Sequence, residues 1–304
     1  MKKYKKTKLR YGENPNQKAH LVNKNNKSIL NFQISGKEIS YNNIIDLDSG
    51  LKCLNEFSEP TSIIIKHTNP CGVASSKTIL DAFKKSYESD SKSAFGGIVF
   101  LNRKLNLNIA KNIMGKFFEM VVAPDFDKNA EKILRSKKKL ILFKIPNFRK
   151  EKLISRSTLF GELYQTIDVS PINKNFVKLV SEKNTSKKSI DDLIFSLKVV
   201  KHLKSNAIVL SRNKQTLGLG HGQTNRVDAL NFAIKNKNIY FKNSSFVCAS
   251  DGFFPFTDSI SLLNRRGCKI IAQPSGSIND KKIISFSIKK NISLYFIKNR
   301  LFKH

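Results

Sequence analysis

A lysine and a histidine stand side by side in residues 61–72, TSIIIKHTNPCG. The β-branched run before Lys66 predicts a buried strand, and in an open α/β sheet ligands bind in the crevice beyond the strand ends. There His67 could accept a proton near neutral pH, while Lys66 offers its charge to a phosphate or a developing oxyanion. A histidine bonded to the backbone beside a solvated lysine explains the dipeptide equally well. The pair needs further residues before it indicates a site.

The next residues raise the possibility of a zinc site, because nucleoside deaminases combine a histidine or cysteine with a Pro-Cys-x-x-Cys segment. Here Pro70-Cys71 is followed by GVA, without a second cysteine, and no H-x-E stretch accompanies it. This ligand set is too small for a catalytic zinc ion. The other cysteines, Cys53, Cys248 and Cys268, are far apart. We therefore expect no metal site, no disulfide framework and a reducing, cytoplasmic environment.

Two later stretches combine turn residues with polar or aromatic side chains. In LGLGHGQTNRVDAL, residues 217–230, glycines precede Asn225, which could cap a helix starting at Arg226. Such a segment can bring backbone N–H groups to an anion, although a tight hairpin turn would use the same glycines. In ASDGFFPFTDS, residues 249–259, Asp258 beyond an aromatic wall would suit a flat heterocycle. Simple core packing is the alternative there.

Apolar runs with the spacing of strands and helices alternate along the chain, which indicates an α/β layered fold with a largely buried sheet. A polar stretch at residues 181–189, SEKNTSKKS, is the candidate link between a first α/β subdomain, 1–180, and a second, 181–304. Beyond it, Ser189 and Asp192 form a predicted capping box. The elements expected are helices at 47–57, 78–88 and 107–119 and strands at 61–65, 97–100, 120–123 and 207–210.

The 304 residues carry Lys+Arg 55 against Asp+Glu 23, a formal net charge of +32. Such a charge suits nucleic acid, a membrane surface or an anionic metabolite. The lysines are scattered, and their short runs lack the glycine and aromatic interleaving of a nucleic-acid platform, so we expect a solvated surface and no nucleic-acid partner. No secretory signal and no apolar run of about eighteen residues occurs, so we expect no membrane association.

In combination, these stretches resemble the AICAR transformylase/IMP cyclohydrolase family, in its formyltransferase part. The resemblance covers nearly the whole chain and is carried by LRYGENPNQ (9–17), IIKHTNPCGVA (64–74), LGHGQTNRVDA (219–229), SDGFFPFTDSI (250–260) and RLFKH (300–304), among others. It implies formyl transfer from the co-substrate 10-formyltetrahydrofolate to the 5-amino group of AICAR, a step of purine (IMP) biosynthesis. It also implies two cytidine-deaminase-like α/β/α subdomains without zinc, and a homodimer with active sites across its interface.

The family's N-terminal cyclohydrolase domain has no counterpart before LRYGENPNQ. We therefore expect no ring closure to IMP from this chain. Either the full gene product is longer or a separate IMP cyclohydrolase closes the ring.

The resemblance also implies roles for single residues. His67 matches the general base, and Lys66 with Asn206 matches the groups that stabilise the oxyanion and protonate the leaving nitrogen. The C-terminal segment folds back to the site in relatives, so we expect an ordered tail, against the usual behaviour of chain ends. Arginines suit the AICAR phosphate because they bind it through two N–H groups. The AICAR-binding positions are Arg10, Tyr11, Asn43, Glu119, Asn225, Arg226, Phe253, Arg300, Phe302 and His304, and the folate-binding positions are Ser93, Gly96, Pro255, Phe256 and Asp258.

Overall fold

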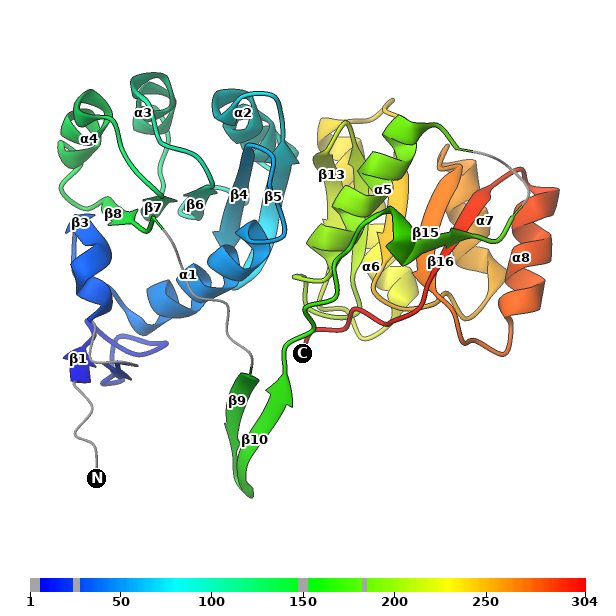
Figure 1. The fold of residues 1–304 in the computed structure, drawn as a ribbon, viewed down its shortest axis with the longest axis horizontal. Coiled ribbons are helices and arrows are strands. Elements are labelled where there is room, and N and C mark those ends of the chain that lie inside the picture. The colour runs from blue at the N-terminus through cyan, green and yellow to red at the C-terminus, as the bar shows by residue number, and fades with distance from the viewer. Residues whose placement is uncertain (1–5, 24–27, 147–152, 182–184) are drawn as a thin grey trace.

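The computed structural model describes residues 6–23, 28–146, 153–181 and 185–304, and within these residues twelve strands form one mixed β-sheet (Figure 1). The sheet confirms the predicted α/β class. In the first half its strands are β3 (Gln33–Ser35), β4 (Thr61–Lys66), β5 (Asn69–Ser75), β6 (Ile98–Leu101), β7 (Met120–Ala123) and β8 (Ile141–Lys144). In the second half they are β11 (Val177–Leu179), β12 (Ile208–Arg212), β13 (Gln215–Gly220), β14 (Val247–Ser250), β15 (Ile270–Pro274) and β16 (Ser293–Ile297). Two separate hairpins pair β1 (Lys6–Lys8) with β2 (His20–Val22) and β9 (Leu153–Thr158) with β10 (Gly161–Thr166).

Helices cover both faces of the sheet. One apolar core runs through both halves beneath α1 and α5, while α2 to α4 and α6 to α8 cover the opposite face of the first and second half. Alternation along β4 separates the layers, since Ile63 and Ile65 belong to the first core and Ile64 to the opposite one. The helices are α1 (Tyr41–Leu54), α2 (Ile79–Ser89), α3 (Leu107–Met114), α4 (Lys128–Arg135), α5 (Lys187–Val200), α6 (Arg226–Tyr240), α7 (Thr257–Arg265) and α8 (Asp280–Lys289), with 3-10 turns η2 (Ile29–Phe32) and η3 (Lys174–Phe176).

Both halves repeat one order of elements. Each has a short strand, a helix, an antiparallel hairpin and then three helix–strand units. The strand order is repeated as well, β5-β4-β6-β7-β8-β3 in the first half and β13-β12-β14-β15-β16-β11 in the second. The two hairpins meet at the centre of the sheet, where Gln215 lies opposite Ala74. The chain thus contains the same topology twice, although its sequence shows no clear period.

The predicted strands at 61–65, 97–100, 120–123 and 207–210 and the helix at 78–88 are confirmed to within one or two residues. The helix predicted from residue 47 begins at Tyr41, because Ser40 and Asn43 form a capping box that the prediction missed. The helix predicted to end at 119 stops at Met114 before Gly115. The predicted Ser189 cap is wrong, because the cap of α5 is Ser186, three residues earlier, whose side chain accepts the Ser189 N–H. Residues 182–184 of the predicted link lie outside the described part of the chain.

Glycines in the two hairpins let helices approach the sheet closely. A Cβ atom on Gly72 in β5 would lie 1.9 Å from the carbonyl oxygen of Ser86 in α2. A Cβ atom on Gly218 in β13 would lie 2.1 Å from the carbonyl oxygen of Ala233 in α6. The missing side chain of Gly218 therefore makes room for the α6 backbone and not for a ligand. Gly72 does the same for α2 at the equivalent position of the first hairpin.

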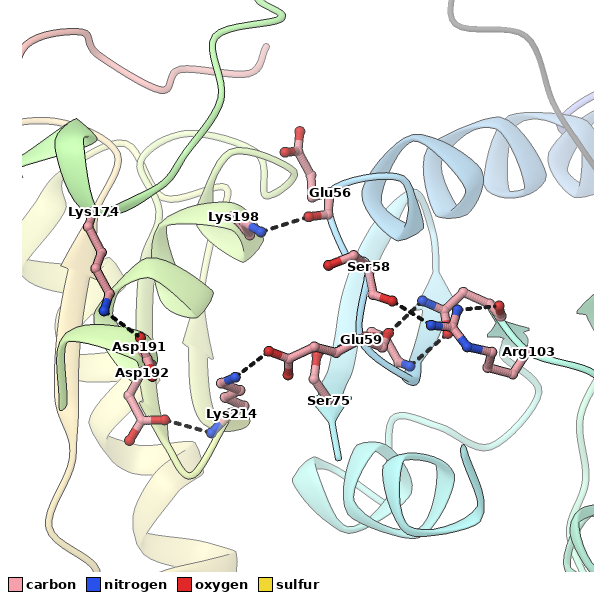
Figure 2. A network of polar contacts seen from close by, with 12 residues as sticks. Glu56, Ser58, Glu59, Ser75, Arg103, Lys174, Asp191, Asp192, Lys198 and Lys214 are labelled. Carbon is pink, nitrogen blue, oxygen red and sulfur yellow. Dashed lines mark hydrogen bonds and ion pairs between the residues drawn. The ribbon is translucent and has the colours of Figure 1, made fainter. Parts of the chain in front are cut away.

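Polar side chains join the two halves beside the central strands (Figure 2). Lys198 of α5 donates to the backbone oxygen of Glu56 at 2.8 Å, and Lys214 forms an ion pair with Glu59. The Glu56 carboxylate lies 3.0 Å from the Lys201 ammonium and 3.3 Å from the His202 ring. Burial acts to raise the pKa of Glu56, but the His202 hydrogen bond and the charges of Lys201 and His202 outweigh it and lower that pKa to about 2. The carboxylate therefore stays ionised between the halves.

We expect Glu56→Gln to reduce stability at neutral pH. A carboxyl group with a depressed pKa contributes stability that is present above its unfolded pKa of 4.5 and is lost as the pH falls through its folded pKa of about 2. The difference in urea midpoint between wild type and variant should therefore shrink on acidification through that window. Glu38→Gln, at an exposed position, is the control. If the difference in urea midpoint between wild type and Glu56→Gln stayed constant with pH, the charge of the Glu56 carboxylate would not be the source of the stabilisation.

Gly218→Ala should destabilise the protein by about 1–3 kcal/mol, because the added methyl group overlaps the α6 backbone. Gly115→Ala is the matched control, since a Cβ there meets nothing within 4 Å. Urea unfolding followed by circular dichroism measures both. Equal midpoints for the two variants would show that α6 can shift away without cost.

Candidate functional site

His67 lies in a two-residue hairpin turn. Lys66 of β4 is paired with Asn69 of β5, and the intervening His67 and Thr68 have φ of 52° and 66°. Positive φ at both positions is the pattern of a type I′ turn. Pro70, Cys71 and Gly72 form no turn, despite their residue types, and belong to β5. Since β4 is antiparallel to both β5 and β6, Lys66 and the exposed His67 lie at a hairpin tip and not beyond a row of parallel strands.

Asp46 of α1 holds this turn, and sequence reasoning missed it. Its Oδ1 accepts a hydrogen bond from the Thr68 N–H at 2.6 Å, and Ser49, one helical turn later, donates to the Thr68 oxygen at 2.6 Å. Burial raises the pKa of Asp46, against the opposing effects of the Thr68 hydrogen bond and the charge of His67. Asp46 lies in α1 one residue before position 47, where the sequence predicts the helix to begin.

Lys66 connects the hairpin to the turn before β6. Its Nζ donates to the Phe95 backbone oxygen at 2.8 Å, next to Gly96, whose φ is 74°. The hydroxyl of Ser93, two residues before Phe95, donates a hydrogen bond to the Asp90 carboxylate at 2.7 Å. The Phe95 ring is 63% exposed and lies 4.8 Å, centroid to centroid, from the exposed ring of Phe117. An aromatic surface that the sequence reasoning did not name therefore adjoins Lys66.

Arg10, Tyr11 and Glu119 lie together in the first half. The Arg10 guanidinium donates to the Tyr11 hydroxyl at 2.9 Å and lies 3.8 Å from the Glu119 carboxylate. Lys37, absent from the predicted set, pairs with the same carboxylate at 2.9 Å. Asn43 is buried, and its side-chain oxygen accepts the Ser40 N–H at 2.9 Å as part of the α1 cap.

Arg226 is anchored by a buried aspartate in the second half. Asn225 caps α6 as predicted, and Arg226 follows it with its guanidinium 2.8 Å from Asp251 and 3.1 Å from the Phe253 backbone oxygen. Asp251 is fully buried and also accepts the Ser205 hydroxyl at 2.6 Å. It belongs to the quoted stretch ASDGFFPFTDS but was not singled out there.

The C-terminal tail folds back onto this cluster. The Arg300 guanidinium lies 5.3 Å from the ring centre of Phe253 and 5.7 Å from that of Phe302, and Phe302 meets the His304 ring at 6.0 Å. The tail backbone is bonded to the body, with the Leu301 N–H donating to the Asp251 oxygen at 3.0 Å. Cations and aromatic rings are thereby gathered on one end of the second half.

Asn206 and the remaining folate-binding positions flank that cluster. The Asn206 amide donates to the backbone oxygens of Gln223 and Thr224 at 2.9 and 3.2 Å, which places it just before the α6 cap. Pro255 accepts a bond from Asn279, Phe256 is 63% exposed at the start of α7, and Asp258 is exposed in its first turn.

The predicted residues form two groups, and among the described residues no hydrogen bond or ion pair joins one group directly to the other. The first-half group contains Lys66, His67 and Arg10, and the second-half group contains Asn206 and Arg226. Their connection runs through other residues, since Asn69 accepts the Lys204 N–H at 3.1 Å and Lys303 reaches the Thr68 oxygen at 3.5 Å. A hollow of about 460 Å³ on α6, lined by Asn231, Ile234, Lys235, Asn238, Ile239 and Arg266, includes none of the predicted positions.

Among the described residues, no three His, Cys, Asp or Glu side chains gather closely enough to hold a metal ion. Cys71, beside the catalytic candidates, has a pKa raised to about 12, chiefly by burial. No helix in the described ranges has both the length and the apolar character needed to cross a membrane.

The chain is therefore an α/β protein of duplicated topology in which basic and aromatic side chains gather at several of the predicted positions. The family model described as "AICARFT/IMPCHase bienzyme" matches residues 1–236, and the chain belongs to this family.

Three curated relatives share the name "Bifunctional purine biosynthesis protein PurH". The protein from Caldicellulosiruptor bescii is 46% identical over 304 residues, 97% of this chain and 59% of the relative. That from Buchnera aphidicola subsp. Baizongia pistaciae is 44% identical over 311 residues, 99% and 58% of the two chains. That from Lactobacillus acidophilus is 40% identical over 308 residues, 98% and 60%. The chain thus spans about three-fifths of the length of the relatives it matches.

Asp251→Asn should cost about 3 kcal/mol of unfolding free energy, because it leaves the Arg226 charge buried without its counter-ion. Asp258→Asn, an exposed change near the same loop, should stay within about 0.5 kcal/mol of wild type. Urea titration measures both variants. An Asp251→Asn protein as stable as the Asp258→Asn protein would show that Arg226 is adequately solvated without Asp251.

Proposed function

We propose that this chain transfers a formyl group from 10-formyltetrahydrofolate to the 5-amino group of AICAR, as a phosphoribosylaminoimidazolecarboxamide formyltransferase of purine biosynthesis. The observation that carries the proposal is the exposed Lys66-His67 hairpin tip in a chain of the AICARFT/IMPCHase family. We assign formyl transfer alone to these residues, and ring closure to IMP to none of them.

The chemistry explains why a base and a fixed cation are needed together. The acceptor amine is conjugated with its ring and is a weak nucleophile, so its proton must leave as nitrogen attacks the formyl carbon. His67, exposed at the hairpin tip, takes that proton. The tetrahedral intermediate carries a negative oxygen, which Lys66 and the Asn206 amide stabilise. Collapse of the intermediate breaks the bond to the folate nitrogen, which takes a proton from Lys66 as it leaves, and the proton held by His67 is returned to Lys66 or to solvent.

In this proposal, cationic side chains from both groups of residues bind the nucleotide. Arg10 and Arg300 bind the AICAR phosphate, and the hydrogen bond from Arg10 to the Tyr11 hydroxyl orients the Arg10 guanidinium. Arg226, held by Asp251, lies over the ring of Phe302, and Arg300 lies over the ring of Phe253. The two rings suit a flat base. The other AICAR contacts are Asn43, Glu119, Asn225 and His304.

Folate lies on the aromatic surfaces in this proposal. Phe256 offers an exposed ring, and Asp258 a carboxylate for the hydrogen-bonding edge of the heterocycle. Pro255, Ser93 and Gly96 complete this side of the site.

We infer that a homodimer completes the site, with each chain supplying part of it. The hairpin β9–β10 supports this view. It extends away from both halves in Figure 1, and Leu159 and Phe160 at its tip are fully exposed, with Leu163 and Tyr164 also exposed. Such apolar surface on a projecting hairpin is typical of an interface. We further infer that each half is a cytidine-deaminase-like unit without zinc, and that the enzyme works in the cytoplasm.

His67→Ala should lower kcat for tetrahydrofolate release by at least about a hundredfold, the usual effect of losing a general base. His20→Ala, which removes an exposed histidine on β2, is the matched control and should retain wild-type turnover. A spectrophotometric assay with AICAR and 10-formyltetrahydrofolate measures both. Full activity of His67→Ala would remove His67 from the mechanism.

The wild-type protein also tests the proposal. A protein that binds a labelled oligonucleotide tightly at physiological salt, but neither AICAR nor a folate analogue, would make the charge of +32 functional and the enzyme assignment wrong. A chain that binds neither AICAR nor folate and shows no turnover would be an idle relative that retains the fold.

A further inference from the structure

The internal duplication supplies a comparison for the turn that carries His67. The second-half hairpin has an equivalent two-residue turn, Asn213-Lys214, with φ of 52° at both residues. Asp192 of α5 accepts the N–H groups of both residues, at 2.9 and 2.7 Å. Asp46 and Asp192 are each the sixth residue of their helix, so the carboxylate that caps the turn is common to both copies. This contact belongs to the shared fold.

The carbonyl side of the two turns differs. The Lys214 oxygen accepts a backbone N–H from Ser75 at 2.9 Å, within the junction of the two hairpins. The Thr68 oxygen instead accepts the Ser49 hydroxyl at 2.6 Å, and the Lys303 ammonium lies 3.5 Å from it. The residue of α5 equivalent to Ser49, the ninth of the helix, is Phe195, which has no donor. The side-chain clamp is therefore a property of the first turn alone.

Both the side chain and the backbone of Lys303 form hydrogen bonds to other parts of the chain. Its Nζ donates to Ser49 Oγ at 3.2 Å and to the His202 backbone oxygen at 3.0 Å. Its backbone oxygen accepts the Ser205 N–H at 2.9 Å, and its N–H donates to the Ser205 hydroxyl at 3.2 Å. The ammonium thus contacts α1, the His67 turn and the end of α5, while the backbone is fixed one residue before Asn206.

Placing the Lys303 ammonium at this position costs free energy of desolvation, which an ammonium extended into solvent would not lose. Burial lowers the pKa of Lys303, which means that the site removes water from the ammonium. The polar oxygens of Ser49, Thr68 and His202 replace that water. A lysine that only served solubility would extend into solvent, as exposed Lys298 does five residues earlier.

We propose that Lys303 is a positioning residue, which fixes the His67-Thr68 turn from its carbonyl side and sets it relative to the second-half group that includes Asn206. The inference rests on the proposed function, because it assigns His67 the role of the base. Lys303 itself touches no substrate in this account. It acts through Thr68 and Ser49, and a small displacement of the turn is enough to slow a reaction that needs a close approach of base and amine.

The first experiment separates turnover from binding. Lys303→Met keeps the apolar stem and removes the charge, and it should lower kcat about 10- to 100-fold, as expected for misplaced catalytic groups. Ser49→Ala removes the hydroxyl that contacts both the Thr68 oxygen and the Lys303 ammonium, but it leaves the bonds of the tail backbone to Ser205 in place. It should lower kcat with KM for AICAR unchanged. The double variant should be no slower than Lys303→Met, because both side chains act on the Thr68 oxygen. Lys298→Met, the matched control on the same terminal segment, should match wild type.

A second experiment does not depend on activity. The chain has five histidines, so a ¹³C-histidine spectrum is simple, and His67→Ala identifies the His67 signal. That signal should shift or broaden in Lys303→Met and in Ser49→Ala, while the His20 signal stays fixed.

Wild-type kcat and an unchanged His67 signal in both variants would overturn the proposal. A fall in kcat of Lys303→Met with an unmoved His67 signal, and a Ser49→Ala protein like wild type, would also overturn it and leave Lys303 as an anchor of the tail only. Absence of formyl transfer by the wild type would overturn the proposed function, and full activity of His67→Ala would remove only His67 from the mechanism. In either case a shifted His67 signal in Lys303→Met would still show that Lys303 sets the turn.

Discussion

The position of His67 depends on a left-handed turn that the surrounding structure must hold. Residues with side chains adopt positive φ at a cost in free energy, and His67 and Thr68 both do so without glycine. Two residues of α1 hold the turn, since Asp46 accepts the N–H of Thr68 and Ser49 donates to the backbone oxygen of Thr68. Because α1 packs on the core that runs through both halves, the location of the exposed histidine is set by buried residues that have no chemistry of their own.

Duplication explains why two similar hairpins have different roles. Each hairpin places a two-residue turn near the other half, and each uses an aspartate from the preceding helix to cap it. At the second turn, Lys214 forms an ion pair with Glu59 across the junction, so its charge is used to join the halves. At the first turn, His67 remains exposed. The same topology therefore provides a structural contact in one copy and a candidate catalytic tip in the other.

The charge of the protein has two distinct parts. Lysines and arginines are scattered along the whole sequence, but three cations near the predicted site positions have specific carboxylate partners. Arg226 is paired with buried Asp251, while Arg10 and Lys37 share Glu119. Cations removed from water need such partners, and the partners also fix their direction. Arg300, which lies over two aromatic rings, is positioned by ring faces instead.

The sequence by itself determined the α/β class, four of the strands, the Asn225 cap and the family, because periodicity, caps and ordered motifs are local signals. It did not determine that Pro70 lies in a strand, that Gly218 admits a helix or that Asp46 and Asp251 support the site. Nor did it indicate that Lys303 reaches the Thr68 carbonyl. These features depend on contacts between residues far apart in the chain, and only the tertiary structure decided them. A hydrogen bond or an ion pair forms according to distance in space, which no local pattern of residue types records.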